Sequence, residues 1–405
     1  MQQISLNKQL VLIGGGHSNV QVLRKLCMHE YKGLNVILIS ESYGAIYSGM
    51  TPGYIEKIYS LDEITIDLQR LCFNAGATFI KDEVVGMDEN NQTIYLKNNP
   101  LISFDILSIN SGSISNKQTI HLENDSKVIS VKPINNLVSK IKLIDEIIEQ
   151  SSQKKVSIIG GGVASFELSF ALHKRYNGNI SLDIISEHLL EEKNLNKSSI
   201  NKIKKIAQNI GINLISKHAT AINNSEIKID HEDIVHSDLI LLSTGASLPE
   251  WLAQSKLEIN ENFVAVNQYL QSLNFKNIFV SGDAASIQNF KRPKSGVMAV
   301  RQGEILKDNL ILFSQNKSLK KIQPQKNWLY LIGTKKNSAI LNYFNFSLEG
   351  KWCWLLKKLI DLNFMKKFSF PGQTNMNKKI FNLTEHKEDI PKMYCQGCGS
   401  KVSKN

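Results

Sequence analysis

The chain has 405 residues, of which 42% are hydrophobic and 21% charged. This is the composition of an ordinary globular protein with room for two or three domains. No apolar run reaches the roughly 18–20 residues that a membrane-spanning helix needs, and the first residues lack the pattern of a signal peptide. Five cysteines without framework spacing favour reduced thiols in a cytoplasm.

The net charge of +11 is unevenly distributed along the chain. From Lys291 to Asn405 there are 22 Lys and Arg against 7 Asp and Glu, whereas the first 290 residues carry 26 against 30. A basic C-terminal third attracts an anionic membrane surface or a nucleic acid, and a solvated lysine face is the plainer alternative. No nucleic-acid recognition motif accompanies the charge, so we expect no nucleic-acid partner.

The first predicted element is a strand, a glycine turn and a helix in "KQLVLIGGGHSNVQVLRKL", residues 8–26. This is how a dinucleotide-binding fold begins, because the glycines let backbone N–H groups approach a pyrophosphate at the helix N-terminus. Gly14 and Gly16 fit the G-x-G-x-x-G motif, but Asn19 stands in the third position. The next strand, 34–40, ends where a carboxylate would hold the ribose, and Ser40 and then Glu41 stand there.

The same pattern recurs at "KKVSIIGGGVASFELSFALHKR", residues 154–175, with Gly160, Gly162 and then Ser165 in the motif positions. A strand at 180–187 follows and again ends in Ser and Glu. One degenerate glycine motif is weak evidence. Two copies, each between an apolar strand and a helix, predict two dinucleotide sites.

Three further strands break at a glycine, at residues 104–113, 237–247 and 277–286. The third ends in Gly282-Asp283, where a carboxylate can accept hydrogen bonds from a ribityl hydroxyl. The alternative is an Asp that caps a helix.

The C-terminal part, 327–370, predicts two strands and a helix from about Gly350. An apolar face runs along the predicted helix and lysines flank it. The face suits either a membrane interface or packing over the rest of the protein. The apolar face comprises Trp352, Leu355, Leu356, Leu359, Ile360 and Met365, and the lysines are Lys351, Lys357, Lys358, Lys366 and Lys367.

Taken together, these motifs resemble the flavoproteins with two dinucleotide-binding domains. These are the pyridine nucleotide-disulfide oxidoreductases and the similar type II NADH dehydrogenases. The resemblance covers about residues 8–312 and implies an α/β fold of two Rossmann-like domains, with an NAD(P)H domain inserted in an FAD domain. A small α+β region follows. The expected limits are 1–117 and 263–325 for the FAD domain, 118–262 for the NAD(P)H domain, 326–390 for the C-terminal region and 391–405 for a tail.

The resemblance also implies the roles of individual residues. Near the flavin and the nicotinamide it places Glu167 and, in the loop "YSGMTPGY", Tyr47 and Met50, for which packing under the loop is an equal alternative. It implies FAD contacts at Gly14, Gly16, His17, Ser18, Ser40, Glu41, Gly282, Asp283 and Gln302. It implies NAD(P)H contacts at Gly160, Gly162, Ser165, Glu187, Thr244 and Gly245.

Disulfide reductases of this family carry a cysteine pair after the second strand, but residues 41–56 contain none. This argues against thiol–disulfide chemistry. Hydride transfer needs stacked rings and exclusion of water rather than a protein acid or base. We therefore expect hydride transfer from NADH to FAD, with NADPH a poorer donor, and then electron transfer to a quinone or a small acceptor. The alternative is a regulatory flavoprotein module that senses NAD(P)H. We expect a cytoplasmic protein with a possible peripheral membrane contact through 350–370.

The tail "MYCQGCGSKVSKN" holds Cys395 and Cys398, which lack the second ligand pair of a structural zinc site, and no metal site is expected. Gly397-Cys398-Gly399-Ser400-Lys401 resembles the glycine-rich loop that opens selenide, water dikinase, with Cys398 and Lys401 at its reactive positions. Fusions of such a flavoprotein with that dikinase are known. The tail therefore predicts the start of a second enzyme, a fused or partner dikinase and a link to selenium metabolism.

Overall fold

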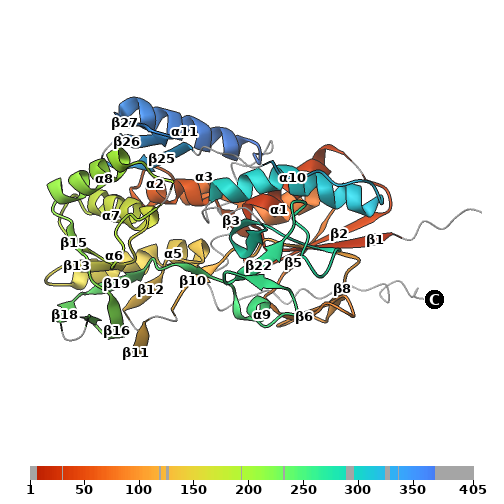
Figure 1. The fold of residues 1–405 in the computed structure, drawn as a ribbon, viewed down its shortest axis with the longest axis horizontal. Coiled ribbons are helices and arrows are strands. Elements are labelled where there is room, and N and C mark those ends of the chain that lie inside the picture. Colours follow the sequence, from red (N-terminus) through yellow and green to blue (C-terminus); the bar gives the residue numbers. More distant parts are fainter. Residues whose placement is uncertain are drawn as a thin grey trace, which may run out of the picture. The chain divides into compact units, whose positions relative to one another are not determined.

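The computed structural model describes residues 7–29, 31–117, 120–124, 127–192, 194–230, 233–288, 296–323, 329–335 and 337–369. Two five-stranded parallel sheets organise them (Figure 1). The first sheet has the order β23-β9-β1-β2-β5 and the second has the order β12-β19-β13-β14-β15. Both glycine motifs follow the central strand of their sheet, β1 or β13. This confirms the predicted α/β class with two Rossmann-like sheets.

The strands of both sheets are apolar because helices or other layers cover a parallel sheet on both faces. In β1 and β9 nearly every side chain is buried. The first sheet comprises β1 (Lys8–Ile13), β2 (Leu34–Ser40), β5 (Thr78–Lys81), β9 (Ile106–Ile109) and β23 (Ile278–Val280). The second comprises β12 (Val128–Ser130), β13 (Lys155–Ile159), β14 (Ser181–Ile185), β15 (Asn213–Ile215) and β19 (Leu239–Leu242).

Two helices from opposite ends of the sequence, α1 (His17–Met28) and α10 (Gly296–Ser314), lie side by side against the first sheet (Figure 1). Ser18 and Gln21 of α1 donate hydrogen bonds to the carbonyls of Ala299 and Val300. Strand β23 comes from the same late part of the chain as α10. The first Rossmann unit is thus assembled from two separated stretches of sequence.

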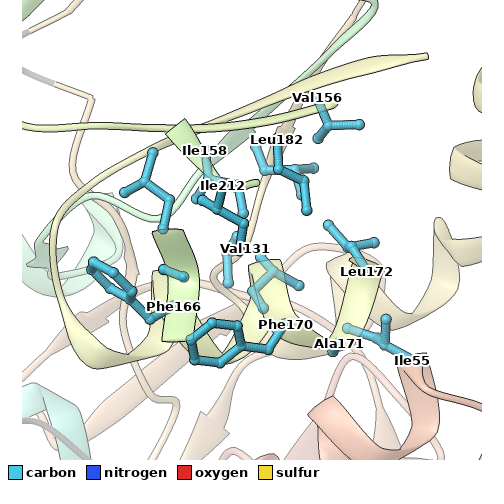
Figure 2. Close-up of a cluster of buried hydrophobic side chains, with 14 of the residues drawn as sticks. Ile55, Val131, Val156, Ile158, Phe166, Phe170, Ala171, Leu172, Leu182 and Ile212 are labelled. Carbon is cyan, nitrogen blue, oxygen red and sulfur yellow. The ribbon is translucent and has the colours of Figure 1, made fainter. Parts of the chain in front are cut away.

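The second sheet packs against α6 (Ile141–Gln150), α7 (Val163–Arg175) and α8 (Lys197–Asn209). Figure 2 shows Phe166 and Phe170 of α7 among the aliphatic side chains of this core, with Ile55 in the same cluster. Ile55 belongs to α2 (Thr51–Ile55), which lies between strands β2 and β5 of the first sheet. A single hydrophobic cluster therefore joins the connection between β2 and β5 to the helix of the second sheet.

The C-terminal region contains three antiparallel strands and the helix α11, not two strands and a helix as the sequence suggested. The third strand was missed because only two residues, Phe344 and Asn345, separate the last two strands, so the sequence shows no marked break between them. The elements are β25 (Leu329–Gly333), β26 (Ala339–Tyr343), β27 (Phe346–Gly350) and α11 (Lys351–Lys366). Figure 1 shows α11 lying along this small sheet.

The remaining elements form connections and small sheets around the two main ones. The strands are β3 (Gly44–Ile46), β4 (Thr65–Asp67), β6 (Val84–Asp88), β7 (Thr93–Leu96), β8 (Ile102–Ser103), β10 (Ile114–Ser115), β11 (His121–Asn124), β16 (Ala219–Asn223), β17 (Glu226–Ile229), β18 (Asp233–His236), β20 (Ala246–Ser247), β21 (Ile259–Asn260), β22 (Phe263–Val266) and β24 (Ala285–Ile287). The helices are α3 (Leu61–Ile64), α4 (Leu68–Asn74), α5 (Ile134–Ser139) and α9 (Glu250–Ala253), with short 3₁₀ turns η1 (Ser48–Met50) and η2 (Gly282–Ala284).

Candidate active site

A cleft of about 1880 Å³ runs between the two main sheets. It is larger than the roughly 300–1,000 Å³ of a pocket for one drug-sized ligand. Residues from both glycine-motif units and from the C-terminal region line it. It contains the carboxyl ends of β1 and β2, where an open parallel sheet binds its ligands.

Only glycine can occupy the first position of the first glycine turn. Gly14 has a φ of +84°, and a Cβ there would lie 2.6 Å from the carbonyl oxygen of Asn110. Asn110 follows β9, and its side-chain oxygen accepts the backbone N–H of Ser18 at 2.9 Å. The turn therefore presses against the end of the neighbouring strand while the start of α1 faces the cleft.

Asn19, which departs from the glycine motif, is fully buried and saturated with hydrogen bonds. Its amide nitrogen donates to the carbonyls of Ile13 and Gly14 at 3.1 and 2.9 Å, and its oxygen accepts from Ser108 at 2.7 Å. A glycine at this position normally permits close packing of helix on strand. Here hydrogen bonds between the helix and the ends of two strands replace that contact, so the departure is compatible with the fold.

Asp283 lies at the centre of a polar group in the cleft. Its carboxylate accepts from the ammonium of Lys132 at 2.7 Å and from the hydroxyl of Ser113 at 3.1 Å. Within the described residues it lies inside the 3₁₀ turn η2, whose N-cap is Ser281. Gly282 has a φ of +71° and its N–H donates to the side chain of Gln302, a buried residue of α10. Carboxylate, ammonium and hydroxyl together suit the hydroxyls and phosphates of a dinucleotide, and these residues fit FAD.

Ser40 and Glu41 line the same cleft at the end of β2. Burial raises the pKa of the Glu41 carboxyl, and the nearby charge of Glu83 raises it further. Ser18 is buried behind the turn, where its hydroxyl donates to Ala299 at 2.7 Å, and does not line the cleft. The nine residues expected at FAD therefore divide into eight in the cleft wall and one, Ser18, behind it.

The second glycine turn repeats the first. Gly160 has a φ of +130°, and a Cβ there would lie 2.2 Å from the carbonyl oxygen of Ser243, directly after β19. Gly162 precedes α7, and Ser165 is fully buried in its first turn. The side chain of Glu187 is exposed beyond the end of β14. Val163, Ala164 and Glu167 of α7 reach the cleft wall.

Thr244 and Gly245 lie beside Asn116, in the chain that enters the second sheet. The Thr244 hydroxyl donates to the carbonyl of Asn116, and the Asn116 N–H donates to the carbonyl of Gly245 at 2.7 Å. Neither residue lines the cleft, and neither do the other residues expected at NAD(P)H, namely Gly160, Gly162, Ser165 and Glu187. Thr244 and Gly245 tie the chain that leaves the second sheet to the chain that enters it, and a direct contact with a nucleotide remains a prediction.

Three aromatic rings gather beside the first glycine turn. The ring of Tyr47 stacks on Phe364 of α11 with centroids 4.6 Å apart, and His17 lies 5.3 Å from Tyr47. The Nε2 atom of His17 is buried and has no hydrogen-bond partner among the described residues. Burial lowers the pKa of His17 to about 4, against a smaller opposing effect of Asp283. Met50 is buried under the loop and is not part of the cleft wall.

Helix α11 sends two charged side chains inward. The Lys357 ammonium donates to the Gly49 carbonyl at 2.8 Å and to Asp361 at 3.1 Å, and Asp361 accepts from the Tyr47 hydroxyl at 3.1 Å. Burial alone would lower the pKa of Lys357, but the carboxylates of Asp361 and Glu167 outweigh it, and the pKa is raised. Lys357 was expected among the lysines that flank the apolar face of the helix, but the helix turns this lysine toward the cleft.

Glu167 lies on the other side of Lys357. Its carboxylate accepts the N–H of Gly333 of β25 at 2.9 Å and borders the cleft. Burial raises the pKa of Glu167, and the charge of Lys357 partly opposes this. The C-terminal region thus closes one wall of the cleft through both its sheet and its helix.

Sequence reasoning missed Lys132 and Asp361. Lys132 carries no motif, since its position depends on the fold bringing 132 next to 283. Asp361 had a local signal, because Lys357 and Asp361 are four residues apart and so share one face of a helix.

The cysteines in the described part of the chain lie outside the cleft. Cys72 and Cys353 are buried and Cys27 is half-buried, and all three are free thiols. Burial raises the pKa of Cys72 to about 12, so its thiol stays protonated and unreactive. None of the three lines the cleft. Cys395 and Cys398 lie outside the described residues, as does the rest of the predicted dikinase-like tail.

Comparison with known proteins identifies the class. The family model for pyridine nucleotide-disulphide oxidoreductases matches residues 8–303, and the chain belongs to this family. It is 25% identical over 387 residues to ferroptosis suppressor protein 1 of Xenopus laevis, covering 90% of this chain and 96% of the relative. It is 26% identical over 267 residues to an NADH-rubredoxin oxidoreductase of Clostridium acetobutylicum, covering 66% and 65%.

The fold agrees with this assignment. The structure of NDH2 from Plasmodium falciparum in complex with NADH superimposes with a TM-score of 0.74 at 15% identity, covering 89% of this chain and 98% of that one. The chain is therefore an FAD-dependent oxidoreductase that uses a pyridine nucleotide. FAD would supply the two-electron chemistry that connects the nicotinamide with an acceptor. Gly14, Asp283 and Gln302 would hold it on the first sheet.

Proposed function

We propose that this protein oxidises NADH and passes the electrons through FAD to a quinone or a small acceptor, without a protein disulfide. The observation that carries the proposal is the wall of the cleft beside the first glycine turn. Where disulfide reductases carry their cysteine pair, this chain has Tyr47, packed against Phe364 and hydrogen-bonded to Asp361. An aromatic and polar wall suits a planar acceptor better than a thiol relay.

The residues expected at the nicotinamide nucleotide favour NADH over NADPH. Glu187 stands just beyond β14, and His188 is 3.1 Å from Glu191 and 3.9 Å from Glu187. A carboxylate here accepts from a ribose hydroxyl, whereas it repels a 2′-phosphate. We infer that replacing Glu187 with Gln narrows the difference in kcat/KM between the two donors.

The test is an anaerobic acceptor screen on the FAD-loaded protein. NADH should bleach the flavin absorbance, and a short-chain quinone, ferricyanide, or a sulfur or selenium compound should restore it over many cycles. A triple variant with Cys27, Cys72 and Cys353 changed to Ala should behave the same, provided that its FAD content is intact. A long-lived reduced complex that no acceptor reoxidises would favour the regulatory alternative instead.

The connection with selenium metabolism rests on the tail sequence alone. We propose it as a hypothesis about a fused or partner dikinase. Two experiments test it. The chain is assayed with ATP and selenide, which should yield no selenophosphate, and the DNA downstream of its gene is sequenced. Absence of any dikinase gene downstream or elsewhere would count against the hypothesis.

A further inference from the structure

The N-terminus of α7 in the second Rossmann unit already holds an anion, the side chain of Glu192. An oxygen of its carboxylate accepts the backbone N–H of Val163, the first residue of α7, at 3.0 Å. The same oxygen would lie 3.5 Å from a Cβ placed on Gly162. Glu192 also lines the cleft. Burial and the nearby charge of Glu192 raise the pKa of Tyr330 of β25 to about 12.

The segment that carries Glu192 is packed firmly onto the glycine turn. The N–H of Leu190 donates to the carbonyl of Gly161 at 2.8 Å. A Cβ on Gly161 would lie 2.0 Å from the carbonyl oxygen of His188, so only glycine allows this approach. Leu189 and Leu190 are both buried. Glu192 therefore reaches α7 because the preceding residues are anchored, and its position is not that of a freely moving side chain.

A Rossmann unit binds the pyrophosphate of a dinucleotide at this place. The free N–H groups and the dipole of the helix N-terminus attract negative charge. Glu192 uses one of these N–H groups and adds a negative charge beside the others. A pyrophosphate and the Glu192 carboxylate cannot both accept from Val163, and like charges at this separation repel each other.

We propose that Glu192 is a built-in competitor for the pyrophosphate of NADH, which it must leave free when the nucleotide binds, and that it thereby sets the affinity of the second site. The inference rests on the proposed use of NADH at α7 and adds the residue that limits its binding. Ser165, in the same first turn, has a fully buried hydroxyl without a hydrogen-bond partner in the described structure. The first turn of α7 thus contains a hydroxyl group that no described side chain satisfies.

The test measures binding without any electron acceptor. The FAD-loaded full chain is titrated by calorimetry with ADP-ribose, which has the pyrophosphate but cannot reduce the flavin, and with adenosine, which lacks the phosphates. Glu192→Gln keeps an oxygen that can accept from Val163 but loses the charge, and Glu192→Ala loses both. A charged hydrogen bond contributes enough that we expect the Kd for ADP-ribose to fall about 10- to 100-fold in Glu192→Ala and less in Glu192→Gln. Adenosine binding should stay within about twofold.

Glu191→Gln is the matched control. Glu191 is the neighbouring residue, its side chain is exposed, and it contacts His188 rather than α7. Its replacement removes the same charge from the same segment, so it reports the long-range electrostatic effect alone. FAD content and the thermal midpoint of each variant verify that the fold is kept.

An unchanged or weakened affinity for ADP-ribose in folded Glu192 variants would overturn the inference, and so would an equal gain in Glu191→Gln. Failure of the wild type and all variants to bind ADP-ribose would also overturn it. The proposed function is judged separately by turnover with NADH. Tighter ADP-ribose binding in a chain that reduces no acceptor would support the inference and refute the proposed function.

Discussion

At the scale of single residues, the cleft combines positions that only one residue type can fill with positions whose chemistry depends on distant neighbours. Gly14 and Gly160 belong to the first kind, since each turns with positive φ against the carbonyl that ends the next strand. Asp283 and His17 belong to the second kind. The surroundings of Asp283 are supplied by residues about 150–170 positions away, Lys132 and Ser113.

Replacing Asp283 with Ala should weaken FAD binding. The change removes an acceptor for ribityl hydroxyls and leaves the Lys132 ammonium without its carboxylate, which costs on the order of 1–3 kcal/mol. We expect the Kd for FAD to rise about 5- to 150-fold, measured by flavin fluorescence during dialysis against a competing apo-flavoprotein. Asp308→Ala, in a Lys-paired carboxylate on α10 that does not line the cleft, is the control. Full flavin retention by the Asp283 variant would contradict the assignment.

His17 should make the protein less stable as the pH falls. Its pKa is about 4 in the folded protein, below the roughly 6.5 of an unfolded chain. Between these values the unfolded state binds a proton that the folded state refuses, so stability decreases with falling pH by up to about 1.4 kcal/mol per pH unit. At pH 5 the loss amounts to about 2 kcal/mol relative to pH 8.

The measurement is urea unfolding at saturating FAD from pH 8 to pH 4, for the wild type and for His17→Gln. The variant does not titrate in this range, so its stability curve should lack this component even if its absolute stability is lower. Parallel curves for the two proteins would show that His17 does not have the lowered pKa.

At the scale of elements, the inner and outer faces of α11 differ in what they contact. Its inner face brings Lys357, Asp361 and Phe364 to the loop that contains Tyr47. Its outer face leaves large apolar side chains exposed, namely Trp352, Leu355, Leu356, Leu359 and Ile360. The sequence placed Met365 in the same stripe, but Met365 is buried. The helix thus both packs onto the loop that contains Tyr47 and keeps an apolar surface, so the two sequence alternatives are not exclusive.

Asp361→Ala should destabilise the protein strongly, because it removes the carboxylate partner of the Lys357 ammonium and the hydrogen-bond acceptor of the Tyr47 hydroxyl inside the protein. Breaking a buried pair typically costs about 3–5 kcal/mol, and removing both charges restores much of it. We expect Asp361→Ala combined with Lys357→Met to be more stable than Asp361→Ala alone in urea unfolding. Glu304→Ala removes an exposed ion pair with Lys307 on α10 and should cost at most about 1 kcal/mol. An equal cost for Asp361→Ala and Glu304→Ala would contradict this account of α11.

At the scale of the whole molecule, the strands that contact α11 also expose apolar side chains. Tyr343, Phe344, Phe346 and Leu348 of the β26–β27 hairpin are also exposed. The C-terminal third carries the positive charge of the protein. None of the helices in the described ranges is long and apolar enough to cross a membrane. Apolar side chains edged by lysines favour peripheral attachment to an anionic surface.

The full chain should therefore sediment with anionic vesicles and be released at high salt, because each lysine near the surface contributes about 1 kcal/mol that salt screens. A variant with Trp352→Glu and Leu359→Glu should lose most of this binding. Phe73→Glu, which changes an equally exposed aromatic residue on α4, should not. Identical sedimentation with neutral and anionic vesicles would refute an electrostatic attachment.

The amino-acid sequence by itself determined the two glycine turns, the buried strands around them and the Gly282-Asp283 pair. These features are local, because a turn with positive φ, an apolar strand and a helix start are specified by neighbouring residues. Only the tertiary structure decided which side chains meet in the cleft. Lys132 reaches Asp283, Asp361 reaches Tyr47 and Glu192 reaches α7 across sequence separations that no local pattern encodes. Their contacts arise from the packing of two sheets and a C-terminal helix. That packing brings residues of both glycine-motif units to one cleft.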